Sequence, residues 1–232
     1  LLVLGQQKPI KAARDQALLL IGWGSAMRRS ELVSIRCEDI TEHATGLEIL
    51  IVRSKTDQEG QGAWVWLSPD TMRRVALWRE AASIRAGALF RRVAVIRTKP
   101  REARRALAIE DLAYHARVDR ERMAARPARA ATVTYGIGER ALTPAAMRLI
   151  IKRTALAAAD QGLVDLMGAD LDHAIDALST HSLRVGLTQD LFANGEDAGP
   201  IAQALRWTST ATALRYGRKL APSSNAAARM LK

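Results

Sequence analysis

The stretch HSLRVG occupies residues 181–186 and places His181 and Arg184 three positions apart. In a helix, side chains at this spacing lie on the same face. Ser179 and Thr180 come directly before the stretch, and both residue types favour the N-cap of a helix. Because the backbone at a helix start attracts anions, an imidazole and a guanidinium placed there predict a binding position for an anion.

The charge of the chain indicates which anion to expect. The 232 residues include 35 Lys and Arg against 24 Asp and Glu, a formal net charge of +11. Such an excess attracts a polyanion, and nucleic acid is the usual one. A membrane surface is the competing partner, but the sequence holds no strongly basic amphipathic helix with a Trp or Leu face. We therefore expect a nucleic-acid partner and no membrane association.

The rest of the composition bears on compartment and cofactors. Hydrophobic residues make up 48% of the chain, enough for a sizeable core, and the longest apolar run, at 17–23, is far too short to span a bilayer. Cys37 is the single cysteine, which excludes an internal disulfide and suits a reducing cytoplasm. The four histidines are dispersed along the chain. We therefore expect neither a metal nor another cofactor.

Periodicity and capping signals predict a mainly α fold with one small antiparallel β-sheet, an α+β protein. Two β-rich runs, 47–53 and 63–67, flank a polar turn and predict a hairpin. Ser68-Pro69 and Thr143-Pro144 are typical helix starts. The expected helices span 11–23, 28–40, 69–86, 144–161, 180–194, 199–206 and 209–220.

Residues 96–140 form an atypical basic segment. The segment is dense in arginine and acidic residues, and its apolar periodicity is weak, so a charged helix, a mobile loop or both remain open. We interpret it as an insertion in a single domain that spans residues 1–232. Residues 221–232 are expected to form a small, polar C-terminal tail.

Several residues elsewhere in the chain suit the same anion as His181 and Arg184. Together they supply the groups needed to attack a phosphodiester without a metal: two arginines for the non-bridging oxygens, an indole N–H donor, a nucleophile, a base and an acid. The candidate site residues are Arg28, Lys55, His181, Arg184, Trp207 and Tyr216.

Each candidate has an expected role. Tyr216 is the nucleophile, and since a phenol has a pKa of about 10, nearby cations must favour the phenolate or His181 must accept its proton. Lys55, on the predicted hairpin, can deliver a proton to the departing sugar oxygen. The rival tyrosines Tyr114 and Tyr135 lie in the atypical segment without a preceding motif.

The order of these motifs resembles the catalytic domain of the tyrosine recombinases, the phage-integrase family that includes lambda integrase and Cre. The family pattern is R-x-S-E-L, a hairpin lysine, H-x-x-R, His or Trp, and Tyr. The chain supplies RRSEL at 28–32, Lys55, HSLR at 181–184, Trp207 and, nine residues later, Tyr216. The resemblance covers roughly residues 10–95 and 140–220.

The resemblance implies a site-specific recombinase or integrase that acts on double-stranded DNA. Such enzymes cleave a strand through a 3′-phosphotyrosine with release of a 5′-hydroxyl, and religation completes strand exchange with neither ATP nor metal. The family works as a homo-tetramer on DNA. The alternative expectation is that a fragment of such a protein is a monomer in solution. The family's N-terminal DNA-clamping domain is expected to be absent from this chain. We also expect the protein to be cytoplasmic and of bacterial or phage origin.

Two other functions compete with recombination. A type IB topoisomerase-like nicking-closing enzyme uses a similar set of arginine, lysine, histidine and tyrosine. A non-catalytic DNA-binding protein of the same fold would need none of them. The H-x-x-R and R-W…Y motifs favour the recombinases, and the complete residue set favours catalysis.

Overall fold

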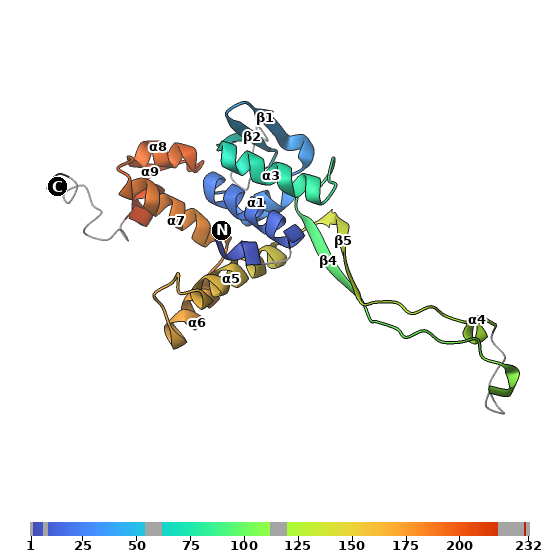
Figure 1. Ribbon diagram of the computed structural model, residues 1–232. Coiled ribbons are helices and arrows are strands. Elements are labelled where there is room, and N and C mark those ends of the chain that lie inside the picture. Colours follow the sequence, from blue (N-terminus) through green and yellow to red (C-terminus); the bar gives the residue numbers. More distant parts are fainter. Residues whose placement is uncertain (1, 7–8, 54–61, 112–119, 218–229, 231–232) are drawn as a thin grey trace. The chain divides into compact units, whose positions relative to one another are not determined.

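The chain divides into two compact units. Figure 1 shows the computed structural model, which describes residues 2–6, 9–53, 62–111, 120–217 and 230. The core unit comprises Leu1–Arg92 and Gly138–Lys232, and the ribbon unit comprises Val93–Ile137. The core unit is mainly helical and contains a three-stranded sheet, while strands β4 (Arg91–Thr98) and β5 (Thr132–Ala141) form a separate two-stranded sheet. The predicted fold class is confirmed, with two small sheets among the described residues where one was expected.

Most of the predicted helices form in the core unit. Local caps explain two of their starts: the Ser68 hydroxyl accepts from the Thr71 N–H, and the Thr143 hydroxyl accepts from the Ala146 N–H. Helix α6 has no counterpart in the sequence prediction. The helices are α1 (Pro9–Ser25), α2 (Arg29–Ser34), α3 (Pro69–Ala81), α5 (Pro144–Asp160), α6 (Gly168–Ala177), α7 (Thr180–Ala193), α8 (Ala198–Ala204) and α9 (Thr210–Gly217), with 3-10 turns at Leu2–Gln6 and Cys37–Asp39.

The predicted hairpin is confirmed and carries a third strand. Strand β2 (Gly46–Ile51) pairs antiparallel with both β1 (Ile40–His43) and β3 (Ala63–Leu67), and Ile49 lies opposite Ile40 and Val65. The alternate residues Val65 and Leu67 of β3 are buried, whereas Trp64 and Trp66 are exposed on the other face.

The predicted helix over 28–40 is wrong beyond Ser34. Helix α2 ends there, and Ile35 and Arg36 are extended because the residues after α2 pair with a distant segment. The Leu89 N–H donates to the Ile35 carbonyl at 2.9 Å, and the Cys37 N–H donates to the Gly87 carbonyl at 2.9 Å. This long-range pairing overrides the local helical pattern.

Helix α1 is the central element of the core and packs against α3 and α7 (Figure 1). Two glycines allow the contact with α7. A Cβ on Gly22 would meet Leu183 at 3.0 Å, and a Cβ on Gly186 would meet the Trp23 ring at 3.0 Å. Gly186 of the HSLRVG stretch therefore lets α7 approach α1 closely.

Residues 96–98 and 132–140 lie in the paired strands β4 and β5, so the interpretation of the segment 96–140 as a charged helix or a loop is wrong over these residues. The runs VAVIRT and TVTY are rich in β-branched residues, which favour the strands β4 and β5 over the helix that their arginine-rich neighbours suggest. The ribbon unit also contains a 3-10 turn at Ile109–Asp111 and the short helix α4 (Arg120–Met123).

Candidate active site

A pocket of about 450 Å³ opens on the core unit where α2, α7 and the C-terminal helices meet. Five of the six predicted site residues line it: Arg28, His181, Arg184, Trp207 and Tyr216. Arg29, which is not among the predicted site residues, lines it as well. Lys55 lies outside the described residues. The structure therefore brings together side chains that are up to 188 positions apart in the sequence.

Arg28 is fixed at the start of α2 by the third residue of that helix. Its backbone N–H donates to Glu31 Oε2 at 2.8 Å, and its guanidinium Nη1 donates to Glu31 Oε1 at 2.8 Å. The Glu31 side chain is only 2% exposed, whereas the Arg28 side chain is 26% exposed. The R-x-S-E-L motif thus anchors one face of the guanidinium and leaves another at the pocket.

Arg184 brings a second guanidinium to the pocket from the first turns of α7. The residue is buried, and its Nη2 donates to the Leu205 carbonyl. Burial, followed by the charges of Arg28 and Arg206, lowers the pKa of Arg184 to about 10, so the group keeps its proton at neutral pH. A bound anion would relieve this repulsion, which is why the pocket suits a phosphate.

Tyr216 lies against both aromatic partners of the pocket. Its Oη lies 3.0 Å from His181 Nε2, a hydrogen bond whose direction depends on the histidine tautomer. Its ring stacks on Trp207 with a centroid distance of 5.3 Å and an angle of 17°. With the imidazole proton on Nδ1, His181 can accept the phenolic proton.

Trp207 connects the second arginine to the tyrosine. Its ring lies 5.1 Å from Arg184 Cζ, a cation–π distance, while its other contacts are with a cluster formed by Ala26, Ile201 and Leu205. The indole therefore packs between the arginine and the tyrosine. Its expected hydrogen bond to a phosphate stays a prediction.

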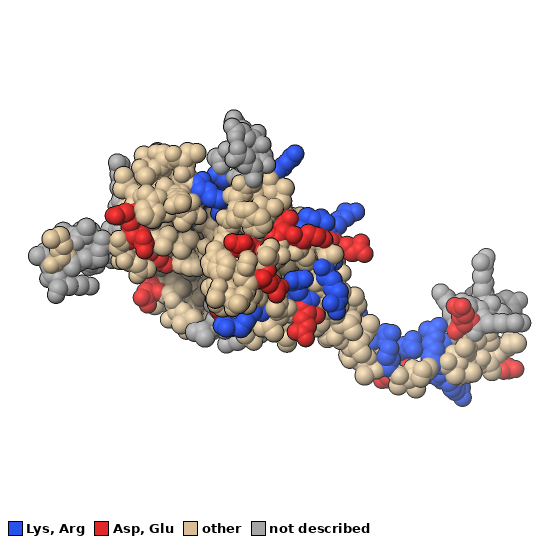
Figure 2. Space-filling view, turned by 90° about the horizontal axis from the view of Figure 1, so that it is seen from above, with Lys and Arg blue, Asp and Glu red and all other residues tan. Residues whose placement is uncertain are grey.

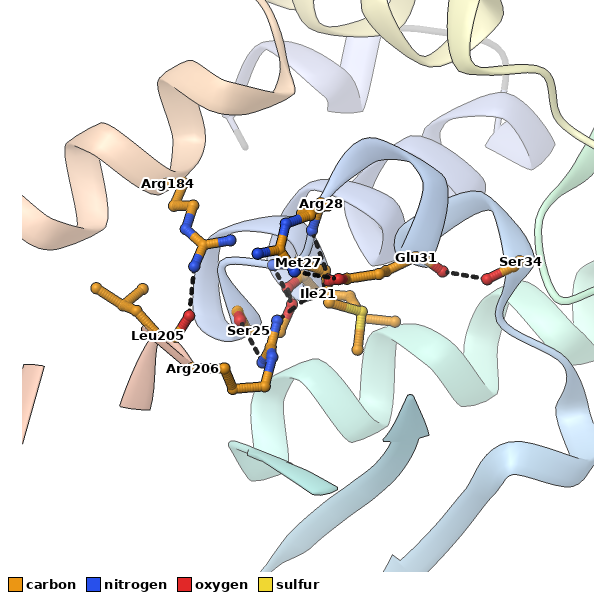
Figure 3. A network of polar contacts seen from close by, with 9 residues as sticks. All are labelled: Ile21, Ser25, Met27, Arg28, Glu31, Ser34, Arg184, Leu205 and Arg206. Atoms are coloured by element: carbon orange, nitrogen blue, oxygen red, sulfur yellow. Dashed lines mark hydrogen bonds and ion pairs between the residues drawn. The ribbon is translucent and has the colours of Figure 1, made fainter. Parts of the chain in front are cut away.

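Arg206 supports the site through Glu31, although it is not among the predicted site residues. Figure 3 shows its guanidinium directed toward the same carboxylate that holds Arg28. Arg206 Nη2 lies 3.2 Å from Glu31 Oε2, and Nη1 donates to the Ser25 carbonyl at 3.3 Å. Glu31 therefore links α2 to the residue that precedes Trp207. The only nearby sequence signal for Arg206 is the R-W dipeptide. Its partner Glu31 lies 175 positions away, so no local pattern connects the two residues.

Arg206 adopts a left-handed backbone conformation with φ 56. We predict that Arg206→Ala lowers the free energy of unfolding by an amount at the lower end of roughly 3–5 kcal/mol. The substitution removes one partner of a buried ion pair, but Arg28 still faces Glu31. Arg206→Gly loses the same ion pair, but glycine avoids the cost of the left-handed conformation, which is about 1 kcal/mol for a residue with a Cβ atom. Urea unfolding should therefore rank the wild type first, then the glycine variant, then the alanine variant. An alanine variant equal to the wild type would show that the ion pair contributes no stability.

The described residues contain no group of three or more His, Cys, Asp or Glu side chains that could hold a metal ion. Nor is any helix in the described part of the chain long and apolar enough to cross a membrane.

Comparisons with known proteins agree with the motifs and the fold. No protein-family model matches the chain. It is 35% identical over 94 residues to an integrase/recombinase XerD homolog of Selenomonas ruminantium, which covers 38% of the chain and 28% of that protein.

Solved structures of the site-specific recombinase XerH on its difH substrate are also similar. The post-cleavage complex matches with a TM-score of 0.55 and 16% identity over 92% of the chain, and the pre-cleavage complex with 0.54 and 17% over 91%. The chain spans 44% of each XerH chain and thus less than half the length of these relatives. The predicted resemblance is confirmed, and the chain has the fold of a tyrosine-recombinase catalytic domain.

Proposed function

We propose that the chain is the catalytic domain of a site-specific DNA recombinase, which cuts and rejoins double-stranded DNA through a 3′-phosphotyrosine. The observation that carries the proposal is the Tyr216 hydroxyl 3.0 Å from His181 Nε2 in a pocket that also contains Arg28 and Arg184. The matched XerH structures, which are complexes with a DNA substrate, support double-stranded DNA as the partner.

In the proposed reaction the Tyr216 oxygen attacks the scissile phosphorus while His181 Nε2 accepts the phenolic proton. The bond from phosphorus to the 5′-oxygen breaks, and Lys55 donates a proton to that oxygen, which leaves a 5′-hydroxyl. Arg28 and Arg184 bind the non-bridging oxygens and stabilise the charge of the transition state, with the Trp207 indole N–H as a further donor. Attack by a 5′-hydroxyl of another strand reverses these steps and completes strand exchange, within a proposed tetramer on DNA.

A pool of nicked suicide duplexes with randomised sequence tests this function, because the nick lets the downstream fragment leave and traps the covalent complex. We expect a protein–DNA adduct on a denaturing gel, whose sequenced DNA reveals the preferred site. We also expect EDTA to leave the yield unchanged, since the proposed chemistry uses only side chains. Loss of the adduct on chelation, with recovery in Mg²⁺, would contradict the mechanism.

The two alternative functions give different outcomes in related assays. A nicking-closing enzyme would relax a supercoiled plasmid but would not exchange strands between two copies of the selected site. A non-catalytic protein of this fold would bind the duplex and form no adduct at any time point. Products that join two marked duplexes at the selected site would support recombination.

Removing the buried guanidinium should slow cleavage far more than it weakens binding. We predict that Arg184→Ala lowers the rate of adduct formation by about 10²–10³-fold, the usual loss for one oxyanion donor. The dissociation constant for duplex DNA should change much less, because many other cations share the phosphate contacts. Arg73→Ala is the matched control, since Arg73 is exposed on α3 beside Asp70. Equal losses of binding and rate in Arg184→Ala would make Arg184 a general DNA contact.

A further inference from the structure

The ribbon unit carries an excess of positive charge that the proposed chemistry does not use. Its stem, defined as residues 97–105 and 126–129, contains seven cationic residues and a single acidic one, Glu102. Figure 2 shows Lys and Arg side chains gathered along the ribbon. Six of the seven cations are arginines: Arg97, Arg101, Arg104, Arg105, Arg126 and Arg129, with Lys99 as the seventh.

Two pairs of these arginines lie directly opposite one another across the ribbon. Arg101 and Arg129 exchange both backbone hydrogen bonds at 2.8 Å, and Arg104 and Arg126 do so at 2.9 and 2.8 Å. Like charges that face each other across an antiparallel pair destabilise it. No carboxylate of the described chain lies within ion-pair distance of Arg101 or Arg129. No described carboxylate therefore offsets the repulsion of this first pair, although Arg101 Nη2 donates to the Pro127 carbonyl at 3.4 Å.

The ribbon has almost no hydrophobic core to offset this repulsion. Among the described residues of Val93–Ile137, Val93 is the one buried hydrophobic residue, at 6% exposure. The strands are held by backbone hydrogen bonds and by the contact between the Thr98 and Thr132 hydroxyls. A two-stranded ribbon of this kind is only marginally stable in water. A polyanion between the arginines would change their interaction from repulsive to stabilising.

We propose that the stem is a second DNA-binding site, which takes the phosphate backbone of a duplex outside the cleavage pocket. Arginine predominates over lysine, and its planar guanidinium suits bidentate contact with phosphate. The major groove of B-DNA is also wide enough to admit a two-stranded β ribbon. The proposal takes double-stranded DNA from the proposed function but is independent of the cleavage chemistry.

The first test measures salt dependence in full-length protein that carries Tyr216→Phe, so that cleavage has no part in it. One variant adds Arg101→Gln and Arg129→Gln, and the matched control adds Arg36→Gln and Arg73→Gln, whose arginines are each paired with a carboxylate on the core unit. Both variants lower the formal charge by the same amount.

Binding of each protein to a mixed-sequence duplex is measured from about 50 to 200 mM salt. Loss of two phosphate contacts should reduce the slope of log K against log salt by about 1.8 in the stem variant, with little change in the control. The stem variant should also be at least as stable to heat as its parent, because one like-charge pair is gone. Equal slopes in both variants would overturn the proposal, and no binding by any of the proteins would instead overturn the proposed function.

Hydrogen exchange separates DNA from an acidic protein as the occupant. The amides of Arg101, Arg104, Arg126 and Arg129 close the backbone ladder, so their exchange should slow when the duplex stabilises the ribbon. Poly-L-glutamate at the same concentration of negative charge should protect them much less. Equal protection by both polymers would identify the stem as a site for acidic chains in general and would contradict the DNA assignment.

Discussion

Tyr216→Phe is expected to abolish the covalent adduct while leaving the protein folded and able to bind DNA. The substitution removes only the hydroxyl, which is the proposed nucleophile and has no substitute in phenylalanine. The ring remains, so its stacking on Trp207 at 5.3 Å should persist. The lost hydrogen bond to His181 is exposed, and such bonds contribute about 0.5–1.5 kcal/mol.

The measurement combines adduct yield on the suicide duplexes with the dissociation constant and the unfolding temperature. Tyr135→Phe is the matched control, because Tyr135 lies in β5 of the ribbon unit and does not line the pocket. It should form adduct at the wild-type rate. An adduct that survives Tyr216→Phe but disappears in Tyr135→Phe would move the nucleophile to the ribbon.

His181 and Arg184 show how much of the site the sequence alone predicts. Their spacing of three and the Ser179 cap predict their common helix start, because capping is local chemistry that neighbouring residues determine. The same reason explains why Ser68-Pro69 and Thr143-Pro144 correctly predict the starts of α3 and α5. That the motifs share a pocket followed from the family resemblance, since no local pattern joins residue 28 to residue 216.

Two errors of prediction involve contacts between distant segments. The helix over 28–40 fails at Ser34 because the backbone of Ile35 and Cys37 pairs with residues 87–89. Arg206 escapes notice because Glu31, its partner, lies on a different helix. In each case the residue contacted in the folded structure is distant in the sequence, so local patterns do not reveal it.

Lys55→Ala is expected to cleave ordinary DNA very slowly and to recover on DNA with a bridging 5′-sulfur. Lys55 lies outside the described residues, so this prediction rests on its place between β2 and β3 and on the family motif. A general acid typically contributes 10²–10⁴-fold, because an alkoxide is a poor leaving group near neutral pH. A thiol ionises with a pKa of about 8.5 and leaves readily as a thiolate, so the sulfur removes the need for an acid.

Single-turnover rates on matched oxygen and sulfur duplexes measure the rescue, and two other variants define its specificity. Tyr216→Phe should stay inactive on both substrates, because the nucleophile is missing whatever the leaving group. Arg184→Ala should gain little from sulfur, since Arg184 is proposed to stabilise charge on the non-bridging oxygens, which the substitution leaves unchanged. If Lys55→Ala gains no more than Arg184→Ala, the proton comes from another group. His181, whose Nε2 would carry the phenolic proton after the attack, and Lys99 would then be the next two candidates to test.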